Sequence, residues 1–145
     1  MRWIAGPTFF SVILLASIAG SAAAQSAVPD LLGTWKGESE TVVLGAGNPH
    51  HHNPAAHPTE PRYTSQPFTL TIDKQDGRRF SGVFSSARSR ETVVAVVSRA
   101  GTIYMVDDDG HSWGTLLAPN RMELCYLHLS ASSRIASCVE LTRQP

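Results

Sequence analysis

The stretch that decides the fold is MELCYLHLSASSRIASCVELTR, residues 122–143. It reads as two strands, 122–129 and 134–143, separated by the small polar residues 130–133. A turn centred between Ala131 and Ser132 places Cys125 directly opposite Cys138. Directly opposed strand residues have Cα atoms roughly 4.5–5.5 Å apart, which is close enough for a disulfide. The sequence therefore predicts a C-terminal hairpin closed by a cross-strand disulfide.

The same register gathers the apolar side chains of this hairpin on one face. Successive side chains of a strand point to opposite faces of the sheet. The face away from the cysteines carries Met122, Leu124, Tyr126, His128, Ile135, Ser137, Val139 and Leu141. We therefore expect one face of the hairpin to be buried.

Alternating segments separated by turn residues also fill the chain before this hairpin, and no amphipathic helix pattern follows residue 30. Asp76-Gly77 and Asp109-Gly110 are typical of tight hairpin turns. Further strands are predicted at 33–44, 68–72, 80–84, 91–98, 102–107 and 112–117. Eight consecutive strands favour an all-β, antiparallel up-and-down barrel, because closure removes exposed edges.

The N-terminal 24 residues are typical of a secretory signal peptide. Arg2 is followed by an apolar run at 9–18 and by the small residues Ala22-Ala23-Ala24. The run is too short for a permanent span of a bilayer about 30 Å thick. We expect residues 25–145 to form one barrel domain without an integral membrane segment, exported to the periplasm or secreted. The pair of cysteines favours such an oxidising compartment.

Charge and motifs exclude several classes of function. The chain has 12 basic and 12 acidic residues, so nothing favours nucleic acid as a partner. Nucleophile elbow, glycine-rich phosphate loop and paired-carboxylate motifs are all absent from the sequence. We expect a protein that is not an enzyme.

A long connection at residues 45–67 interrupts the series of short turns, and it is rich in proline and histidine. Alternate connections of an up-and-down barrel lie at the same end. This end therefore gathers all six histidines, which are His50, His51, His52, His57, His111 and His128. Imidazoles suit zinc or copper, so His50, His51, His52, His57 and His111 are candidate ligands of a metal. The alternative is a solvated Pro-rich loop without metal. The acidic run 107–109 is better explained by a turn than by a calcium loop.

An eight-stranded barrel holds either packed side chains or one small ligand. A ligand in the interior would contact Phe84, Met105, Trp113, Tyr126 and His128. Residues 93–97 are apolar on both faces, and Leu127 and Leu129 point outward. This outer stripe favours a partner or a homo-oligomer, unless residues 26–32 or the long loop cover it.

Gly33-Thr34-Trp35 on the first strand and Arg143 on the last resemble the calycin superfamily, which includes lipocalin-like and avidin-like barrels. The resemblance implies that Gly33, Trp35 and Arg143 close one barrel end, with the guanidinium packed across the indole. Residues 29–35 and 68–87 are similar to segments of avidin-type barrels. Trp113 is the only further tryptophan after the leader, so biotin binding is not implied.

These features predict an exported binding protein that takes a small apolar ligand or a protein partner at the open barrel rim. One alternative is metal binding by the histidines, and another is an inhibitor-like module whose long loop docks into a target enzyme. No other cofactor is expected.

Overall fold

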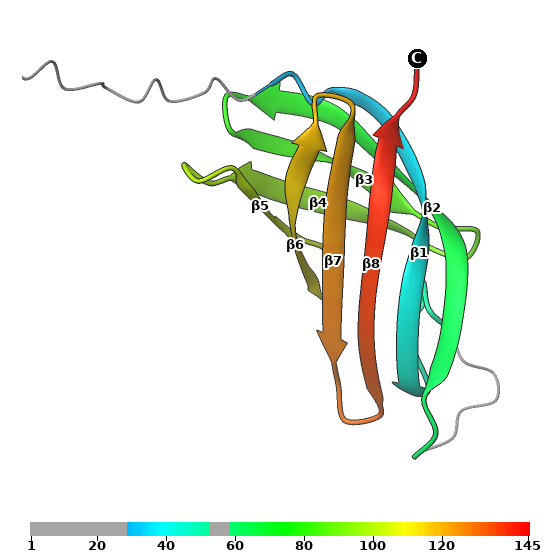
Figure 1. Cartoon of the computed structure of the whole chain (residues 1–145). Helices are drawn as coiled ribbons and strands as arrows, with labels where there is room; N and C mark the ends of the chain where they lie inside the picture. The colour runs from blue at the N-terminus through cyan, green and yellow to red at the C-terminus, as the bar shows by residue number, and fades with distance from the viewer. Residues whose placement is uncertain (1–28, 53–58) are drawn as a thin grey trace, which may run out of the picture.

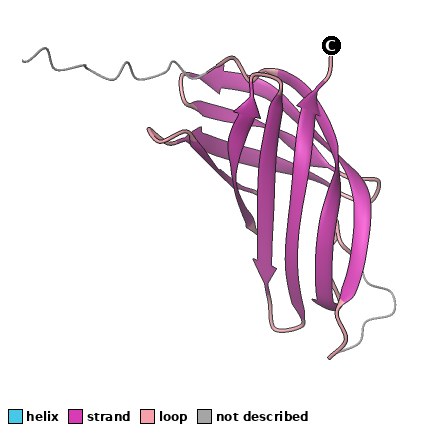
Figure 2. Ribbon diagram, viewed as in Figure 1, coloured by secondary structure: helices cyan, strands magenta, loops and turns pink. Residues whose placement is uncertain are grey.

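Eight antiparallel strands close into a barrel, as predicted, in a computed structural model that describes residues 29–52 and 59–145 (Figure 1). The strands are β1 Gly33–Gly45, β2 Arg62–Asp76, β3 Arg79–Ser85, β4 Arg90–Val97, β5 Thr102–Val106, β6 His111–Ala118, β7 Arg121–Leu129 and β8 Ser133–Arg143. The segments between the described strands are loops and turns (Figure 2). The predicted signal peptide, residues 25–28 and His57 lie outside the described residues.

Neighbours in the sequence are neighbours in the sheet, and β1 completes the ring by pairing with both β2 and β8. Among the described residues, no helix is long and apolar enough to cross a membrane.

The C-terminal hairpin confirms the predicted register. Cys125 pairs with Cys138 across β7 and β8, and the two are joined by a disulfide with a Cα–Cα distance of 4.0 Å. Along β8, buried and exposed residues alternate strictly from Ser133 to Glu140. Period-2 alternation fixes the register here, since a slip by one residue would turn every apolar side chain to solvent.

The predicted boundary between the long loop and β2 is wrong. β2 begins at Arg62, not at Phe68, and Pro67 pairs with Glu38 of β1. β3 reaches only as far as Thr69, which pairs with Ser85, so residues 62–68 have β1 as their one neighbour in the sheet. Proline lacks an N–H but is tolerated on such an edge. The loop between β1 and β2 therefore spans only residues 46–61.

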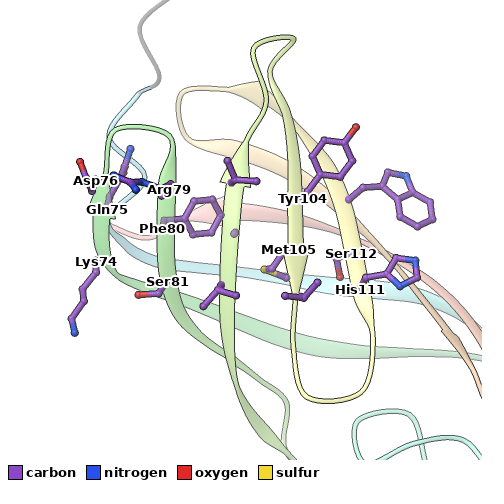
Figure 3. A pocket seen from close by; sticks show the side chains of 15 residues that line it. Lys74, Gln75, Asp76, Arg79, Phe80, Ser81, Tyr104, Met105, His111 and Ser112 are labelled. Carbon is purple, nitrogen blue, oxygen red and sulfur yellow. Dashed lines mark hydrogen bonds and ion pairs between the residues drawn. The ribbon is translucent and has the colours of Figure 1, made fainter.

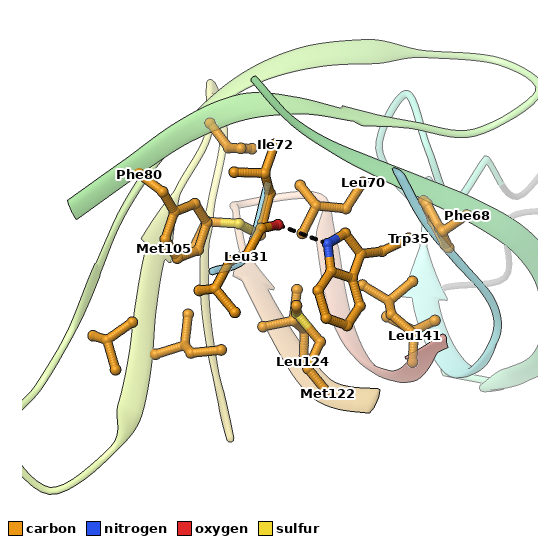
Figure 4. Packing of buried hydrophobic residues seen from close by; sticks show 14 residues of the cluster. Leu31, Trp35, Phe68, Leu70, Ile72, Phe80, Met105, Met122, Leu124 and Leu141 are labelled. Atoms are coloured by element: carbon orange, nitrogen blue, oxygen red, sulfur yellow. Dashed lines mark hydrogen bonds between the residues drawn. The ribbon is translucent and has the colours of Figure 1, made fainter. Parts of the chain in front are cut away.

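The apolar core fills the barrel toward the end where β1 starts and β8 finishes, which we call the closed end (Figure 4). Leu31 and Trp35 are fully buried there, and the Trp35 indole Nε1 donates to the Leu31 carbonyl at 2.9 Å. Arg143 pairs with Trp35 across β1 and β8, and its guanidinium carbon lies 5.8 Å from the centre of the indole ring. Gly33 has a φ of 117°, and a Cβ there would lie 3.5 Å from Arg143 Nε. Glycine is therefore favoured by the positive φ, while the space beside Arg143 would still admit a Cβ in ordinary contact.

Residues before β1 seal this end. The side chain of Gln75 accepts a hydrogen bond from Leu31 N at 2.7 Å and donates to the Pro29 carbonyl at 3.0 Å. Arg143 Nη1 donates to the Asp30 carbonyl at 3.1 Å. Residues 29–32 therefore lie across the closed end and do not cover the outer stripe.

Candidate functional site

The opposite end of the barrel, which we call the mouth, is filled by the start of the long loop. Ala46 N donates to the Ser132 carbonyl at 3.1 Å, and Asn48 Nδ2 donates to the Tyr126 hydroxyl at 3.0 Å. These bonds turn the loop inward. The side chains of His50 and His51 are only 5% and 6% exposed. The loop thus acts as a plug made of two imidazoles.

The His50 ring packs edge-on beside two phenylalanines, Phe68 and Phe84, which stack on each other with 4.7 Å between their ring centres. Its ring centre is 5.5 Å from that of Phe68 and 6.0 Å from that of Phe84. Its Nδ1 lies 2.8 Å from Ser86 Oγ, and its Nε2 lies 3.2 Å from Glu91 Oε2. Burial lowers the pKa of His50, although the negative charges of Asp107 and Asp109 oppose this effect. The ring is therefore neutral at pH 7.

His51 packs beside Phe68, with 5.4 Å between the ring centres, and stacks on Tyr126. Gln66 Nε2 donates to His51 Nδ1 at 3.0 Å and to the His50 carbonyl at 2.8 Å, which leaves the proton of His51 on Nε2. Burial, together with the neighbouring His50, lowers the pKa of His51 to about 4. Gln66 belongs to the part of β2 that was expected to be loop, so the sequence did not identify this partner.

Tyr126 connects the plug to the turn between β5 and β6. Its hydroxyl donates to Asp109 Oδ1 at 2.7 Å while accepting from Asn48. Burial and this carboxylate together raise the pKa of the phenol, so it stays protonated and remains a donor. His128 is half-buried nearby, with Nδ1 3.0 Å from the Asp109 carbonyl.

Three carboxylates converge beside the plug. One oxygen each of Glu91, Asp107 and Asp109 lies within 4.8 Å of the others. Glu91 opens β4, whereas the two aspartates belong to the β5–β6 turn, as the Asp109-Gly110 motif predicts. Burial, together with the charges of Asp109, Asp107 and Asp108, raises the pKa of Glu91 to about 7. Glu91 was not identified from the sequence as a neighbour of the two aspartates, because its place depends on the register of β4 and β5, in which Val94 pairs with Val106.

Little free space remains inside the mouth. A cavity of about 20 Å³ is lined by His50, His51, Phe68, Phe84, Asp107, Ser112, Leu124, Tyr126, Ser137 and Val139. That volume holds about one water molecule. Of the predicted ligand contacts, Phe84 and Tyr126 line this space, while Met105 is buried in the apolar core.

The expectation that Trp113 points into the barrel is wrong. Its side chain is 38% exposed on the outer face, where it pairs with Cys125. The register shifts between Leu116 and Ala118 by a β-bulge, so one extra residue reverses which side chains of β6 point inward. A tight turn without the bulge would place Trp113 opposite inward-facing Tyr126.

The outer face has a separate apolar hollow of about 860 Å³ over β3 to β6 (Figure 3). Its exposed apolar side chains are those of Val94, Val96, Tyr104, Val106 and Trp113. The predicted outer stripe on β4 is therefore present, and no described segment of the chain covers it.

The five candidate metal-binding histidines do not share one place in the described structure. His50 and His51 are buried in the plug, His52 and His111 are exposed, and His57 is not described. His111 lies on the outer face, beside Trp113, with 6.1 Å between the ring centres. Within the described ranges, the only group of three or more metal-ligating side chains that meet is Glu91, Asp107 and Asp109.

No protein-family model matches the sequence, and the search of curated proteins returns no match. Among solved structures, a redesigned beta barrel is similar with a TM-score of 0.46 and 11% identity, over 79% of this chain and 92% of that chain. The S-type phycobiliprotein lyase of Guillardia theta is similar with a TM-score of 0.37 and 12% identity, over 79% of this chain and 89% of that chain. Likeness at this level assigns no function. The class defined by this chain's own strand pairing is a small closed β-barrel, a fold compatible with a binding role.

Proposed function

We propose that this protein is an exported, calycin-type binding protein that takes a small apolar ligand into the mouth of its barrel and does not catalyse a reaction. The observation that carries the proposal is the plug. Two neutral imidazoles of a loop cover the stacked rings of Phe68 and Phe84, His50 in contact with both phenylalanines and His51 in contact with Phe68. When the loop swings out, an aromatic-lined cavity opens at the mouth, and the closed end stays packed.

The walls of that space suit an apolar molecule with one polar group. Phe68, Phe84, Leu124 and Val139 supply apolar surface, and Tyr126 and Ser137 supply hydroxyls. Pockets of this kind are mostly apolar with a few polar groups that fix orientation. The loop is held by single hydrogen bonds, each worth about 1 kcal/mol net, and by ring contacts of His50 and His51 that an apolar ligand would replace. A ligand can therefore displace it at moderate cost.

The proposal is tested with N-phenyl-1-naphthylamine, a neutral apolar probe that fluoresces when shielded from water. The double variant H50A/H51A removes the plug side chains and should bind the probe at least tenfold more tightly than wild type. An apolar cavity of about 150 Å³ is enough to hold benzene. Adding S112L to this variant refills the space and should restore weak binding. Thermal melts confirm that each variant is folded.

The outer hollow provides the matched control. V94S makes that surface polar without touching the mouth and should leave probe binding by H50A/H51A unchanged. Equal binding by wild type and H50A/H51A, or loss of binding in V94S, would overturn the proposal. Native mass spectrometry of the exported protein should show a retained small molecule in a fraction of the population.

A further inference from the structure

The carboxylate cluster at the mouth is costly as it stands. Three acidic groups, one of them only 6% exposed, have oxygen atoms within 4.8 Å of one another. Like charges this close disfavour ionisation unless a positive charge lies among them. Asp107 Oδ1 accepts from Gly110 N at 2.7 Å, and Asp109 Oδ1 accepts from Tyr126, so both side chains are held in place by other parts of the mouth.

A second observation comes from the plug. His50 Nδ1 lies on Ser86 Oγ, and this contact directs Nε2 at Glu91 Oε2, 3.2 Å away. Both of these facing atoms are buried, and neither makes a hydrogen bond within the described part of the chain. Buried polar atoms are nearly always bonded, and an exception calls for an explanation such as an ion. Histidines that bind a metal through one ring nitrogen usually donate the other N–H to an oxygen, the place that Ser86 Oγ takes here.

We propose that Glu91, Asp107 and Asp109 bind a divalent cation, and that His50, whose Nε2 lies 3.2 Å from Glu91 Oε2, joins these three carboxylates as a fourth ligand. Carboxylates favour hard cations such as Mn²⁺, and the imidazole favours Zn²⁺ and Mn²⁺ over Ca²⁺ or Mg²⁺. The donor set therefore assigns the site to Mn²⁺ or Zn²⁺. Asp109 is exposed, which provides an entry path for the ion. This site shares only His50 with a site built from the loop histidines.

The site also couples the loop to the barrel. His50 belongs to the plug, whereas the three carboxylates belong to β4 and the β5–β6 turn. A cation held by all four residues would fasten the plug in the mouth. The inference goes beyond ligand binding, since the cation can bind whether or not the cavity accepts an apolar molecule.

Calorimetric titration of metal-stripped protein with MnCl₂, ZnCl₂ and CaCl₂ tests the site. We expect one equivalent of Mn²⁺ or Zn²⁺ to bind, and a rise in melting temperature with that metal. D109N should weaken binding at least tenfold. D108N removes the same charge from the neighbouring residue, which is outside the cluster, and should keep the wild-type affinity. H50Q should weaken binding and reduce the rise in melting temperature at a fixed metal concentration.

Three outcomes would overturn the inference: the absence of binding by Mn²⁺ and Zn²⁺, equal weakening by D108N and D109N, or binding of Ca²⁺ alone. Loss of binding in H52A/H57A/H111A with wild-type affinity in D109N would place the metal on the loop histidines instead. The naphthylamine experiment is done with a chelator present, so its result is independent of the cation.

Discussion

The two ends of this barrel are closed by opposite means. At the closed end, Leu31 and Trp35 are fully buried apolar side chains, and the chain segments that carry them are consecutive with β1. At the mouth, His50 and His51 are equally hidden but polar, and they come from a loop. The closed end is held by apolar packing, whereas the mouth combines ring contacts of the two imidazoles with hydrogen bonds to side chains of β2 and β7 and to the β3–β4 turn.

This difference has a thermodynamic consequence. Burial of a large apolar side chain contributes several kcal/mol, and its loss leaves a cavity. A hydrogen bond that replaces a bond to water contributes about 1 kcal/mol. The mouth is therefore the end that can open while the rest of the barrel stays folded, as local unfolding requires.

Among the variants that test this comparison, Trp35→Ala should have the largest effect on stability. We expect a loss of about 3–5 kcal/mol in the free energy of unfolding, because a large buried side chain is removed from the core. Urea denaturation followed by circular dichroism measures it, and Trp35→Phe gives a milder change if the alanine variant does not fold. Trp113→Ala, on the outer face, is the matched control and should cost less than about 1 kcal/mol. An equal loss of stability in the two alanine variants would contradict a core that is concentrated at the closed end.

The C-terminal hairpin could be predicted from the sequence because local pattern determines it, whereas closure by Gly33, Trp35 and Arg143 was expected only from the resemblance to calycin-type barrels. Alternation and opposed cysteines fix the register of β7 and β8, and Gly33 and Trp35 mark the start of β1. The inward plug could not be predicted, because His50 and His51 depend on partners up to 78 residues away through Asn48 and Tyr126. A Pro-rich segment carries no periodicity from which its direction can be inferred.

The orientation of Trp113 is a second feature that could not be predicted from the sequence. Its orientation depends on a one-residue bulge, and the small inward residues of β6 offer little guidance. At inward-facing Gly114, a Cβ would lie 1.9 Å from the Glu123 carbonyl oxygen, so the interior has no room for a larger side chain there. That constraint is visible only once β6 and β7 are paired.

Removal of the disulfide tests whether the closed end and the mouth unfold together, with a single free energy of unfolding. Cys125 and Cys138 join β7 to β8. Their bond restricts a short loop in the unfolded chain and contributes about 3 kcal/mol. C125S/C138S should lower the free energy of unfolding by that amount in urea, with no change in the exposure of the plug. If the variant instead loses hydrogen-exchange protection only at the mouth, the disulfide-linked hairpin stabilises that end alone.

Acidification should open the mouth selectively in protein kept free of metal by a chelator. The pKa of His51 falls from 6.5 to about 4 on burial. The closed loop thus binds fewer protons than the open loop between these values, and stability is lost as pH falls through this window. At pH 5 the shift corresponds to about 2 kcal/mol in favour of the open loop. Glu91, whose pKa is raised to about 7, acts in the opposite direction and gains stability as pH falls.

The variant His51→Asn separates these two effects because it removes the imidazole and leaves Glu91 in place. Hydrogen exchange of the Ala46 and His51 amides, corrected for intrinsic rates, reports opening of the loop. Between pH 8 and pH 5, wild type should lose protection relative to the variant, while amides of β7 and β8 stay protected. A parallel loss in both proteins would mean that His51 does not drive the opening.

The smallest expected effect is at the closed end. Arg143→Met removes the hydrogen bonds to Asp30 and Leu32 and the contact with the Trp35 ring. Because the Arg143 side chain is 31% exposed, water offsets part of each interaction, and we expect a loss of about 1 kcal/mol in urea. Arg143→Lys should lose nearly as much, since an ammonium keeps the charge but not the planar fork.

Arg121 supplies the matched control on the same side of the barrel. Arg121 Nε lies 2.8 Å from Glu140 Oε1, and both side chains are exposed. Solvent screens such an ion pair, so Arg121→Met should leave the free energy of unfolding unchanged. If neither Arg143→Met nor Arg121→Met changes the free energy of unfolding, the guanidinium only covers the indole. Apolar packing alone then distinguishes the closed end from the mouth. If Arg143→Lys retains full stability, charge rather than shape explains the contact, and the resemblance to calycin-type closure loses its physical basis.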